Sequence, residues 1–186
     1  MQALPQVNPN LAYAYYVWEL YRSYSYPYFQ QPAHSSPYYG YERFSSQPAA
    51  GTAIQDHGKQ PTVINIEKVT KQNDTFRTAI WTGEHFQVTV MSIPVGSDIG
   101  LEVHPHTDQF IRLEQGQGLV QMGKTKERLD FQAAAGEGDA IMVPAGTWHN
   151  VTNTGNVPLK VYVIYAPPQH PFGTVHRTKA DAMAAE

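Results

Sequence analysis

Three residues with metal-ligating side chains alternate along one short stretch of the chain: Glu102, His104 and His106. The stretch is expected to form a strand, and side chains two positions apart on a strand point to the same face. Glu102 and His104 therefore converge, and His106 follows if the strand continues through Pro105. A carboxylate beside imidazoles suits Mn²⁺, Fe²⁺ or Zn²⁺ better than soft copper(I). The pattern predicts a site for one divalent metal ion.

A second stretch, residues 138–153, reads GDAIMVPAGTWHNVTN and places glycine and proline where a strand should begin and end. Its first glycine turns the chain into a buried strand, and Pro144 and Gly146 end that strand in a tight turn. His149 then begins the next strand and points inward. The spacing Gly-x5-Pro-x-Gly-x2-His-x3-Asn, completed by Asn153, resembles the second signature of the cupin superfamily with no departure.

The first cupin signature fits the chain in two registers. The signature is Gly-x5-His-x-His, followed by Glu after three or four residues and by Gly after six more. The register anchored on Gly96 and Gly116 keeps every spacing. It puts Glu102 in place of the first histidine, keeps His104 as the second, and puts Gln109 in place of the glutamate.

The alternative register uses the visible pair His104 and His106. It puts Asp98 where the glycine belongs and leaves two residues before Gln109, so we prefer the glycine-anchored register. Whether Glu102 or His106 is the ligand stays open at this point. The resemblance implies one divalent metal ion (Mn, Fe or Zn) held by Glu102, His104, Gln109 and His149, with His106 as a further candidate ligand.

The resemblance also implies an all-β fold, the double-stranded β-helix or jelly-roll barrel of RmlC-like cupins. Independently, short β-rich runs alternate with turns from about residue 59, as is typical of a barrel. Strands are expected at 85–93, 99–104, 109–114, 118–122, 140–143, 148–151 and 159–165, with a charged hairpin tip at 124–130 and a short helix at 178–186. The expected barrel lining is Phe86, Val88, Val90, Ile111, Leu113, Ile141, Val143, Val161 and Val163.

The first part of the chain has a different composition from the rest. Ten of the 12 tyrosines lie in residues 1–53, together with six prolines and four charged residues. Those prolines exclude long helices and strands, and one short helix is expected at 11–22. We divide the chain into a low-complexity Tyr/Pro-rich arm (1–58), a cupin β-barrel domain (59–170) and a C-terminal tail with a short helix (171–186).

Composition excludes several classes of function. A net charge of −3 leaves no basic excess for displacing phosphate counterions, so we expect no nucleic-acid partner. The absence of cysteine excludes thiolate catalysis and Cys-ligated zinc. No apolar run approaches the roughly 18 residues that a membrane span needs. No apolar core follows Met1 as in a secretory signal, so we expect a cytoplasmic protein.

Two functional hypotheses follow. The first is a metal-binding cupin that binds a small organic molecule or acts on it, as an oxidoreductase, isomerase or hydrolase if it is an enzyme. The second is a structural protein that uses the barrel as a building block, because the arm resembles the tyrosine-rich tails of spore-coat proteins, which need no signal peptide. In both we expect a homo-oligomer, with the arm docked on a neighbouring subunit or, alternatively, on its own barrel.

Overall fold

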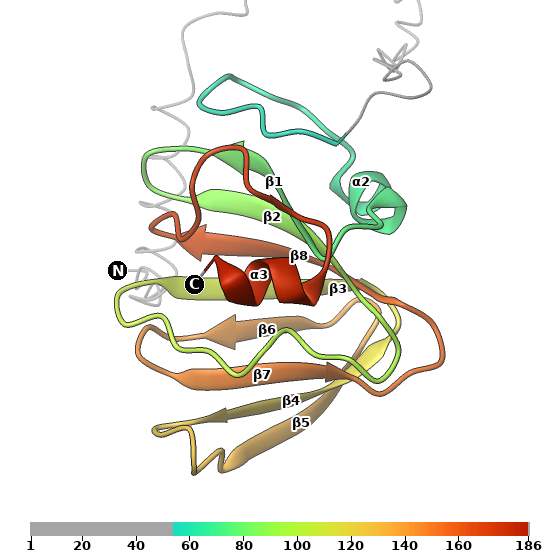
Figure 1. Ribbon diagram of the computed structural model, residues 1–186, viewed down its shortest axis with the longest axis vertical. Helices are drawn as coiled ribbons and strands as arrows, with labels where there is room; N and C mark the ends of the chain where they lie inside the picture. Colours follow the sequence, from blue (N-terminus) through green and yellow to red (C-terminus); the bar gives the residue numbers. More distant parts are fainter. Residues whose placement is uncertain (1–53, 186) are drawn as a thin grey trace, which may run out of the picture. The chain divides into compact units, whose positions relative to one another are not determined.

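The computed structural model describes residues 54–185, which lie within one compact unit of the chain (Figure 1). The arm up to residue 53, with its expected helix, lies outside the described residues. The strands are β1 (Arg77–Thr82), β2 (Gln87–Ile93), β3 (Asp108–Gln115), β4 (Gln117–Gly123), β5 (Phe131–Gly136), β6 (Ala140–Val143), β7 (Trp148–Asn153), β8 (Leu159–Ala166) and β9 (Val175–His176). The helices are α2 (Ile66–Gln72) and α3 (Lys179–Ala184).

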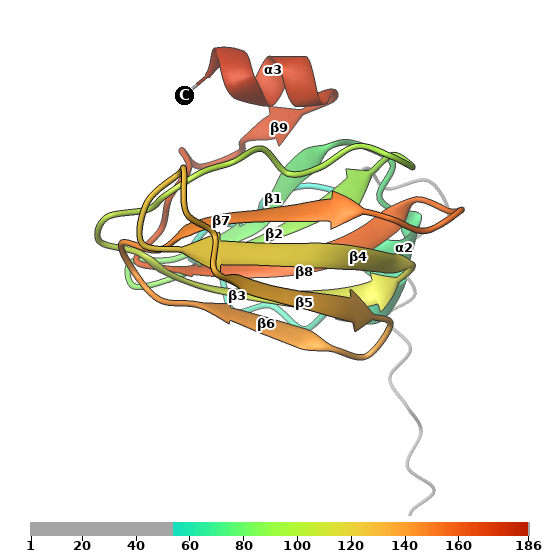
Figure 2. The same cartoon turned by 90° about the horizontal axis from the view of Figure 1, so that it is seen from below.

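The strands form two antiparallel sheets that face each other across a hydrophobic core (Figure 2). The larger sheet has the order β6-β3-β8-β2-β1-β9, and the smaller has the order β5-β4-β7. The predicted all-β barrel and the short C-terminal helix are therefore confirmed. No helix among residues 54–185 is both long and apolar enough to cross a lipid bilayer.

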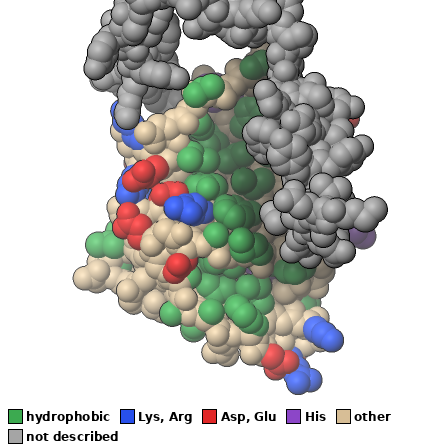
Figure 3. All heavy atoms as spheres, turned by 180° about the vertical axis from the view of Figure 1, so that it is seen from behind, with side chains coloured by type: hydrophobic (Ala, Val, Ile, Leu, Met, Phe, Trp, Pro, Cys, Tyr) green, Lys and Arg blue, Asp and Glu red, His purple; other side chains and the backbone are tan. Residues whose placement is uncertain are grey.

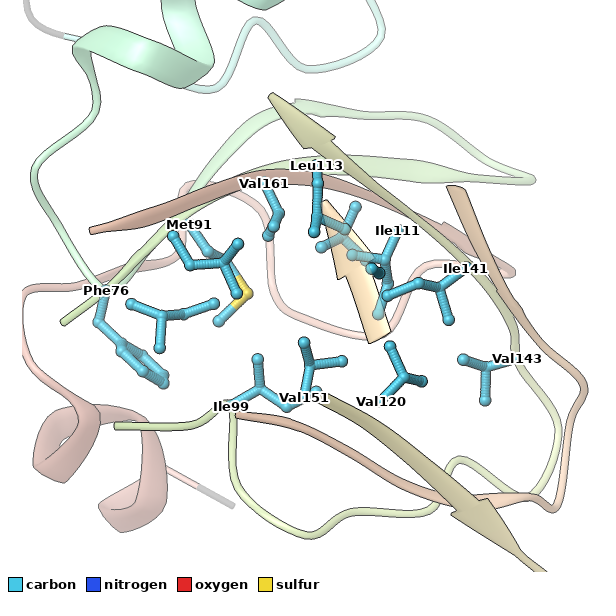
Figure 4. Close-up of a cluster of buried hydrophobic side chains, with 14 of the residues drawn as sticks. Phe76, Met91, Ile99, Ile111, Leu113, Val120, Ile141, Val143, Val151 and Val161 are labelled. Carbon is cyan, nitrogen blue, oxygen red and sulfur yellow. The ribbon is translucent and has the colours of Figure 1, made fainter. Parts of the chain in front are cut away.

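Alternating side chains of both sheets fill the space between them (Figure 4). On β3, Ile111 and Leu113 point inward, and they pair across the ladder with Val163 and Val161 of β8. Burying a side chain of this size contributes roughly 2 kcal/mol, so this layer supplies much of the stability. Seven of the nine predicted lining residues are buried, and the two exceptions, Phe86 and Val88, belong to β2 or precede it.

The prediction of which β2 side chains point into the barrel is wrong, because the inward-pointing positions are shifted by one residue from the predicted Phe86, Val88 and Val90. Thr89 pairs with the core residue Val163, so the inward positions are Gln87, Thr89 and Met91. Val90 is buried on the opposite face, and Phe86 is 40% exposed. Helix α2 packs on the larger sheet, which buries part of its outer face. A strand buried on both faces loses the simple alternation on which the expectation rested.

The chain departs from the expected elements at the segment that carries Glu102 and His104. Residues 99–104 do not form a named strand. The segment from Asp98 onward contacts β7 through two isolated bridges, Asp98 to Thr152 and Glu102 to His149. Strands β1 and β5 and helix α2 were not expected. In the second signature, Gly138 and Gly146 have φ values of 92° and 75°, which are readily adopted by glycine and confirm their role in turns.

Candidate metal centre

Glu102, His104 and His149 meet inside one end of the barrel. One ligand atom from each lies within 4.8 Å of the others, and the three residues are 7%, 6% and 1% exposed. The Oε1 atom of Glu102 is 3.4 Å from the Nε2 atom of His104 and 3.3 Å from that of His149. Because ligands bind Zn²⁺ and similar ions at about 2.0–2.2 Å, atoms of one coordination shell lie up to about 4.4 Å apart. The cluster is close to that size.

Backbone hydrogen bonds hold these three residues in place. The amide of Glu102 donates to the carbonyl of His149 at 3.1 Å, and the amide of His149 donates back to Glu102 at 2.9 Å. The carbonyl of His104 accepts from the amide of Gly146 at 2.8 Å, in the tight turn before β7. The two signature stretches are thereby joined to each other, so that the ligands of one face the ligand of the other.

The donor atoms fit a metal ion. The Nδ1 atom of His149 is 2.9 Å from the carbonyl oxygen of Thr147, so an N–H there leaves Nε2 with a lone pair. Neither carboxylate oxygen of Glu102 and neither Nε2 atom has a hydrogen bond of good geometry with any described residue. Buried polar atoms without partners are costly, and a divalent cation would satisfy all of them together. Borderline metals such as Mn²⁺, Fe²⁺ and Zn²⁺ match two imidazoles and a carboxylate.

Arg77, at the start of β1, is a buried cation that forms an ion pair with the carboxylate of Glu102. Its Nη2 atom lies 3.8 Å from the Oε2 atom of Glu102, and its side chain is 1% exposed. Burial alone would raise the pKa of Glu102, but the contacts with His104 and His149 and the charge of Arg77 hold it below its usual range. Glu102 is therefore a carboxylate at neutral pH, as a metal ligand must be.

Comparisons with known proteins identify the family to which this barrel belongs. The profile of the cupin domain family matches residues 89–165. Protein YrkC of Bacillus subtilis (strain 168) is 66% identical over 133 residues, which cover 72% of this chain and 72% of that protein. The chain belongs to the cupin superfamily.

Other relatives of this cupin extend the comparison. Protein L612 of Acanthamoeba polyphaga mimivirus is 40% identical over 117 residues, 62% of this chain and 71% of that protein. The crystal structure of BH2720 from Bacillus halodurans is 65% identical with a TM-score of 0.70, covering 71% of this chain and 100% of that one. The protein TT1209 from Thermus thermophilus, at 20% identity and a TM-score of 0.50, covers 57% of this chain and 98% of its own and shares the fold.

The two remaining predicted ligands, Gln109 and His106, lie in different surroundings. Gln109 is buried on β3 opposite Tyr165, at the same end of the barrel, and its Oε1 atom has no hydrogen bond among residues 54–185. His106 is exposed in the turn after Pro105 and is not part of the cluster. Asp108, the neighbour of Gln109 in the chain and not a predicted ligand, is exposed, and its carboxylate accepts from the amide of Ala145 at 2.8 Å.

Polar and aromatic side chains that the sequence reasoning missed surround the cluster. The Tyr165 ring meets His104 edge-on at 5.7 Å and His170 at 5.0 Å. Gln87 holds the backbone of His170 on both sides, accepting from its amide at 3.0 Å and donating to its carbonyl at 2.9 Å. Burial raises the pKa of Tyr165 to about 12. Burial, and then the charge of Arg77, lowers the pKa of His170 to about 3.

The sequence contained some signals for these residues. Arg77 opens an otherwise uncharged strand, and a single buried arginine requires an anion nearby. Gln87 lies in a strand whose inward parity could be read only once the pairing was known. Tyr165 has the same parity as Val161 and Val163, which were predicted to point inward. His170 has no ligand spacing to the other candidate residues, and it lies beyond the matched cupin profile.

Proposed function

We propose that this cupin binds one divalent metal ion through Glu102, His104 and His149, and uses it to bind or transform a small organic molecule inside the barrel. The observation that carries the proposal is the buried carboxylate facing two imidazole nitrogens, none of them satisfied by another described residue. Gln109 is proposed as a fourth ligand because its unpaired amide oxygen lies at the same end of the barrel.

The proposed metal is Mn²⁺, Fe²⁺ or Zn²⁺, from the donor set. Such an ion polarises a carbonyl or carboxylate, or activates water or dioxygen, which is compatible with an oxidoreductase, an isomerase or a hydrolase. The residues around it have separate tasks. Thr147 orients the ring of His149, Arg77 balances the charge of Glu102, and Tyr165 stays protonated as a neutral hydrogen-bond donor.

The chemistry of the surroundings refines the proposed ligand. Val143 and Ile141 supply an apolar wall, while Gln109 and Tyr165 supply polar groups next to the metal ligands. A small molecule with an apolar or aromatic body and a pair of oxygen atoms directed at the metal fits this division. Most small-molecule sites likewise combine an apolar lining with a few polar groups.

Metal content of the purified full chain tests the proposal. Elemental analysis is expected to find close to one equivalent of Mn, Fe or Zn per chain, and Glu102→Gln, which keeps the shape but removes the charge, is expected to lose most of it. Glu137→Gln is the matched control, because Glu137 is an exposed carboxylate paired with Lys71. A wild-type protein that stays metal-free after incubation with each ion would overturn the proposal.

One observation favours the second candidate, a structural role. The outer face of the larger sheet carries hydrophobic side chains, and Figure 3 shows a band of them on the side opposite α3. A hollow there is lined by Phe110, Met142 and Ile164, and Met142 is 62% exposed. We propose that this face mediates a homo-oligomer, and that the tyrosine-rich arm docks on a neighbouring subunit. A cytoplasmic or spore-coat location is compatible with both roles.

A further inference from the structure

Strands β5 and β6 leave a seam between the two sheets. Each lies at the end of its sheet, so within residues 54–185 no ladder of hydrogen bonds joins them, and they run along the same side of the barrel (Figure 2). The short turn between them carries the chain from the smaller sheet to the larger, and Asp139 stabilises it by accepting from the amide of Gly136 at 2.8 Å. Edge strands that are not paired need some other cover.

A cavity of about 410 Å³ lies along this seam. Its walls come from β4, β5, β6 and the turn that carries Asp139, and apart from Asp139 the side chains that line it are apolar. The lining includes Val120 and Met122 of β4, Phe131 and Ala133 of β5, and Ile141 and Met142 of β6. Cavities of a few hundred cubic ångströms are of the size that small ligands occupy. The small side chain of Ala133 leaves the middle of the seam open.

One residue that lines this cavity lies beside a metal ligand on the neighbouring strand. Met122 of β4 pairs directly with His149 of β7, and the two side chains share the inner face of the smaller sheet. Directly opposed residues of an antiparallel pair have Cβ atoms about 5 Å apart. Met122 therefore both lines the cavity and lies next to His149 on the inner face of the sheet. A methionine side chain is flexible and adapts its shape to a neighbour.

We infer that the seam between β5 and β6 is the route by which a small apolar molecule reaches the metal cluster, with Met122 as the gate. The inference rests on the proposed function, since it assumes a metal at Glu102, His104 and His149. The ligands are at most 7% exposed, so a molecule must enter the barrel to meet them. The ligand class is a molecule with a single aromatic ring or a short branched chain, whose body lies in the seam and whose oxygen pair faces the cluster.

The test uses the metal-loaded full chain and 4-nitrocatechol, an aromatic ring with two adjacent oxygens whose visible absorption shifts on chelation. Titration of the wild type is expected to give a saturable shift that the metal-free protein lacks. Ala133→Leu narrows the seam and Met122→Trp blocks the gate, so each is expected to weaken binding by about tenfold or more. The metal content of both variants is expected to stay close to one per chain.

Gln132→Leu is the matched control, because Gln132 neighbours Ala133 on β5 but is exposed on the outer side. It is expected to bind the probe as the wild type does. If Met122→Trp fails to fold or loses metal, Ala133→Leu decides, since Ala133 pairs with Val120, two residues along β4 from the Met122 that pairs with His149. Unchanged binding in a folded, metal-loaded Ala133→Leu protein would overturn the route.

The outcomes separate this inference from the proposed function. A wild type that retains metal but gives no shift with 4-nitrocatechol overturns the ligand class while the metal site stands. A wild type that retains no metal overturns the proposed function itself. Both results are read from spectra and elemental analysis and need no assay of turnover.

Discussion

Glu102 and His149 are joined twice, through the backbone and through their side chains. Each amide donates to the other's carbonyl, at 3.1 and 2.9 Å, and the Oε1 atom of Glu102 lies 3.3 Å from the Nε2 atom of His149. Glu102 belongs to no named strand, yet this bridge fixes it to β7 as a ladder would. The position of the carboxylate is therefore set by the strand that carries the histidine, and a segment outside both sheets can still hold a defined ligand.

The first prediction concerns the ligands themselves. His104→Ala and His149→Ala each remove a ligand nitrogen from the buried cluster. Each is expected to weaken metal affinity by more than about 100-fold, because even the loss of a residue that only hydrogen-bonds to a metal ligand can weaken the affinity by up to about 100-fold. Competition with a chromogenic chelator measures the affinity. His106→Ala is the control, because His106 is exposed in a turn outside the cluster, and its affinity should match that of the wild type. Full metal stoichiometry in the His104→Ala/His149→Ala double variant would refute the site.

This control also settles the register that the sequence left open. Loss of metal in His106→Ala together with retention in Glu102→Gln would show that the glycine-anchored register is wrong. The opposite pattern would support Glu102 as the ligand.

The second prediction concerns Arg77. Replacing it by methionine keeps much of the length of the side chain but leaves Glu102 as a buried carboxylate without its cationic partner at 3.8 Å. In the metal-free protein this is expected to lower the free energy of unfolding by roughly 3 kcal/mol. Added Mn²⁺ or Zn²⁺ replaces the missing positive charge, so the melting temperature of Arg77→Met should rise more on metal addition than that of the wild type. Equal rises in both proteins would contradict this role for Arg77.

The sequence predicted the barrel and its second signature well for a physical reason. Gly138, Pro144 and Gly146 act through local backbone conformation, and local conformation can be read from residue type. The inward parity of β3 and β8 also followed from alternation. The parity of β2 did not, because both of its faces are buried and its inner face carries the polar Gln87 and Thr89.

The candidate site was only partly predictable for another reason. Glu102, His104 and His149 were chosen from spacing, and the structure brings all three together. The exclusion of His106 depends on the turn at Pro105, and spacing alone does not show whether a strand passes a proline. Arg77 reaches Glu102 from β1, and His170 packs on Tyr165 from the segment after β8. Their roles depend on long-range contacts that no local pattern contains.

The third prediction concerns the pH dependence of stability at His170. Burial lowers its pKa in the folded protein to about 3, whereas the unfolded chain has a value of about 6.5. Between these two pH values the unfolded state binds more protons at His170 than the folded state does. The contribution of His170 to the free energy of unfolding is therefore fully present above pH 6.5 and is lost as the pH is lowered towards 3. His170→Asn removes this contribution, and its denaturation midpoint should fall less between pH 7.5 and pH 5 than that of the wild type.

The measurement is made in EDTA, so that metal release at low pH does not contribute. His106→Ala serves as the control, because His106 is an exposed histidine. The denaturation midpoint of His106→Ala should change with pH as that of the wild type does. If the midpoint of His170→Asn also falls as much as that of the wild type between pH 7.5 and pH 5, His170 is not a buried, neutral histidine.

The last prediction concerns the tyrosine-rich arm. Residues 1–58 carry large aromatic side chains and almost no charge, and burying one exposed aromatic contributes on the order of 2 kcal/mol. Several tyrosines buried against a neighbouring subunit would offset the entropy lost on ordering the arm. We therefore expect the full chain to form a larger oligomer than a chain that lacks residues 1–53.

The truncated chain for this comparison should begin at Ile54. Starting at Lys59 would remove Asp56, whose carboxylate accepts from the hydroxyl of Thr82 at 2.5 Å and the amide of Gly173 at 3.0 Å. It would also remove the hydrogen bond from the amide of His57 to Ile80, so that a loss of stability could be mistaken for a loss of assembly. Light scattering gives the two masses and calorimetry the two melting temperatures. If both quantities are the same for the two chains, the arm does not mediate assembly, and its tyrosines must act elsewhere.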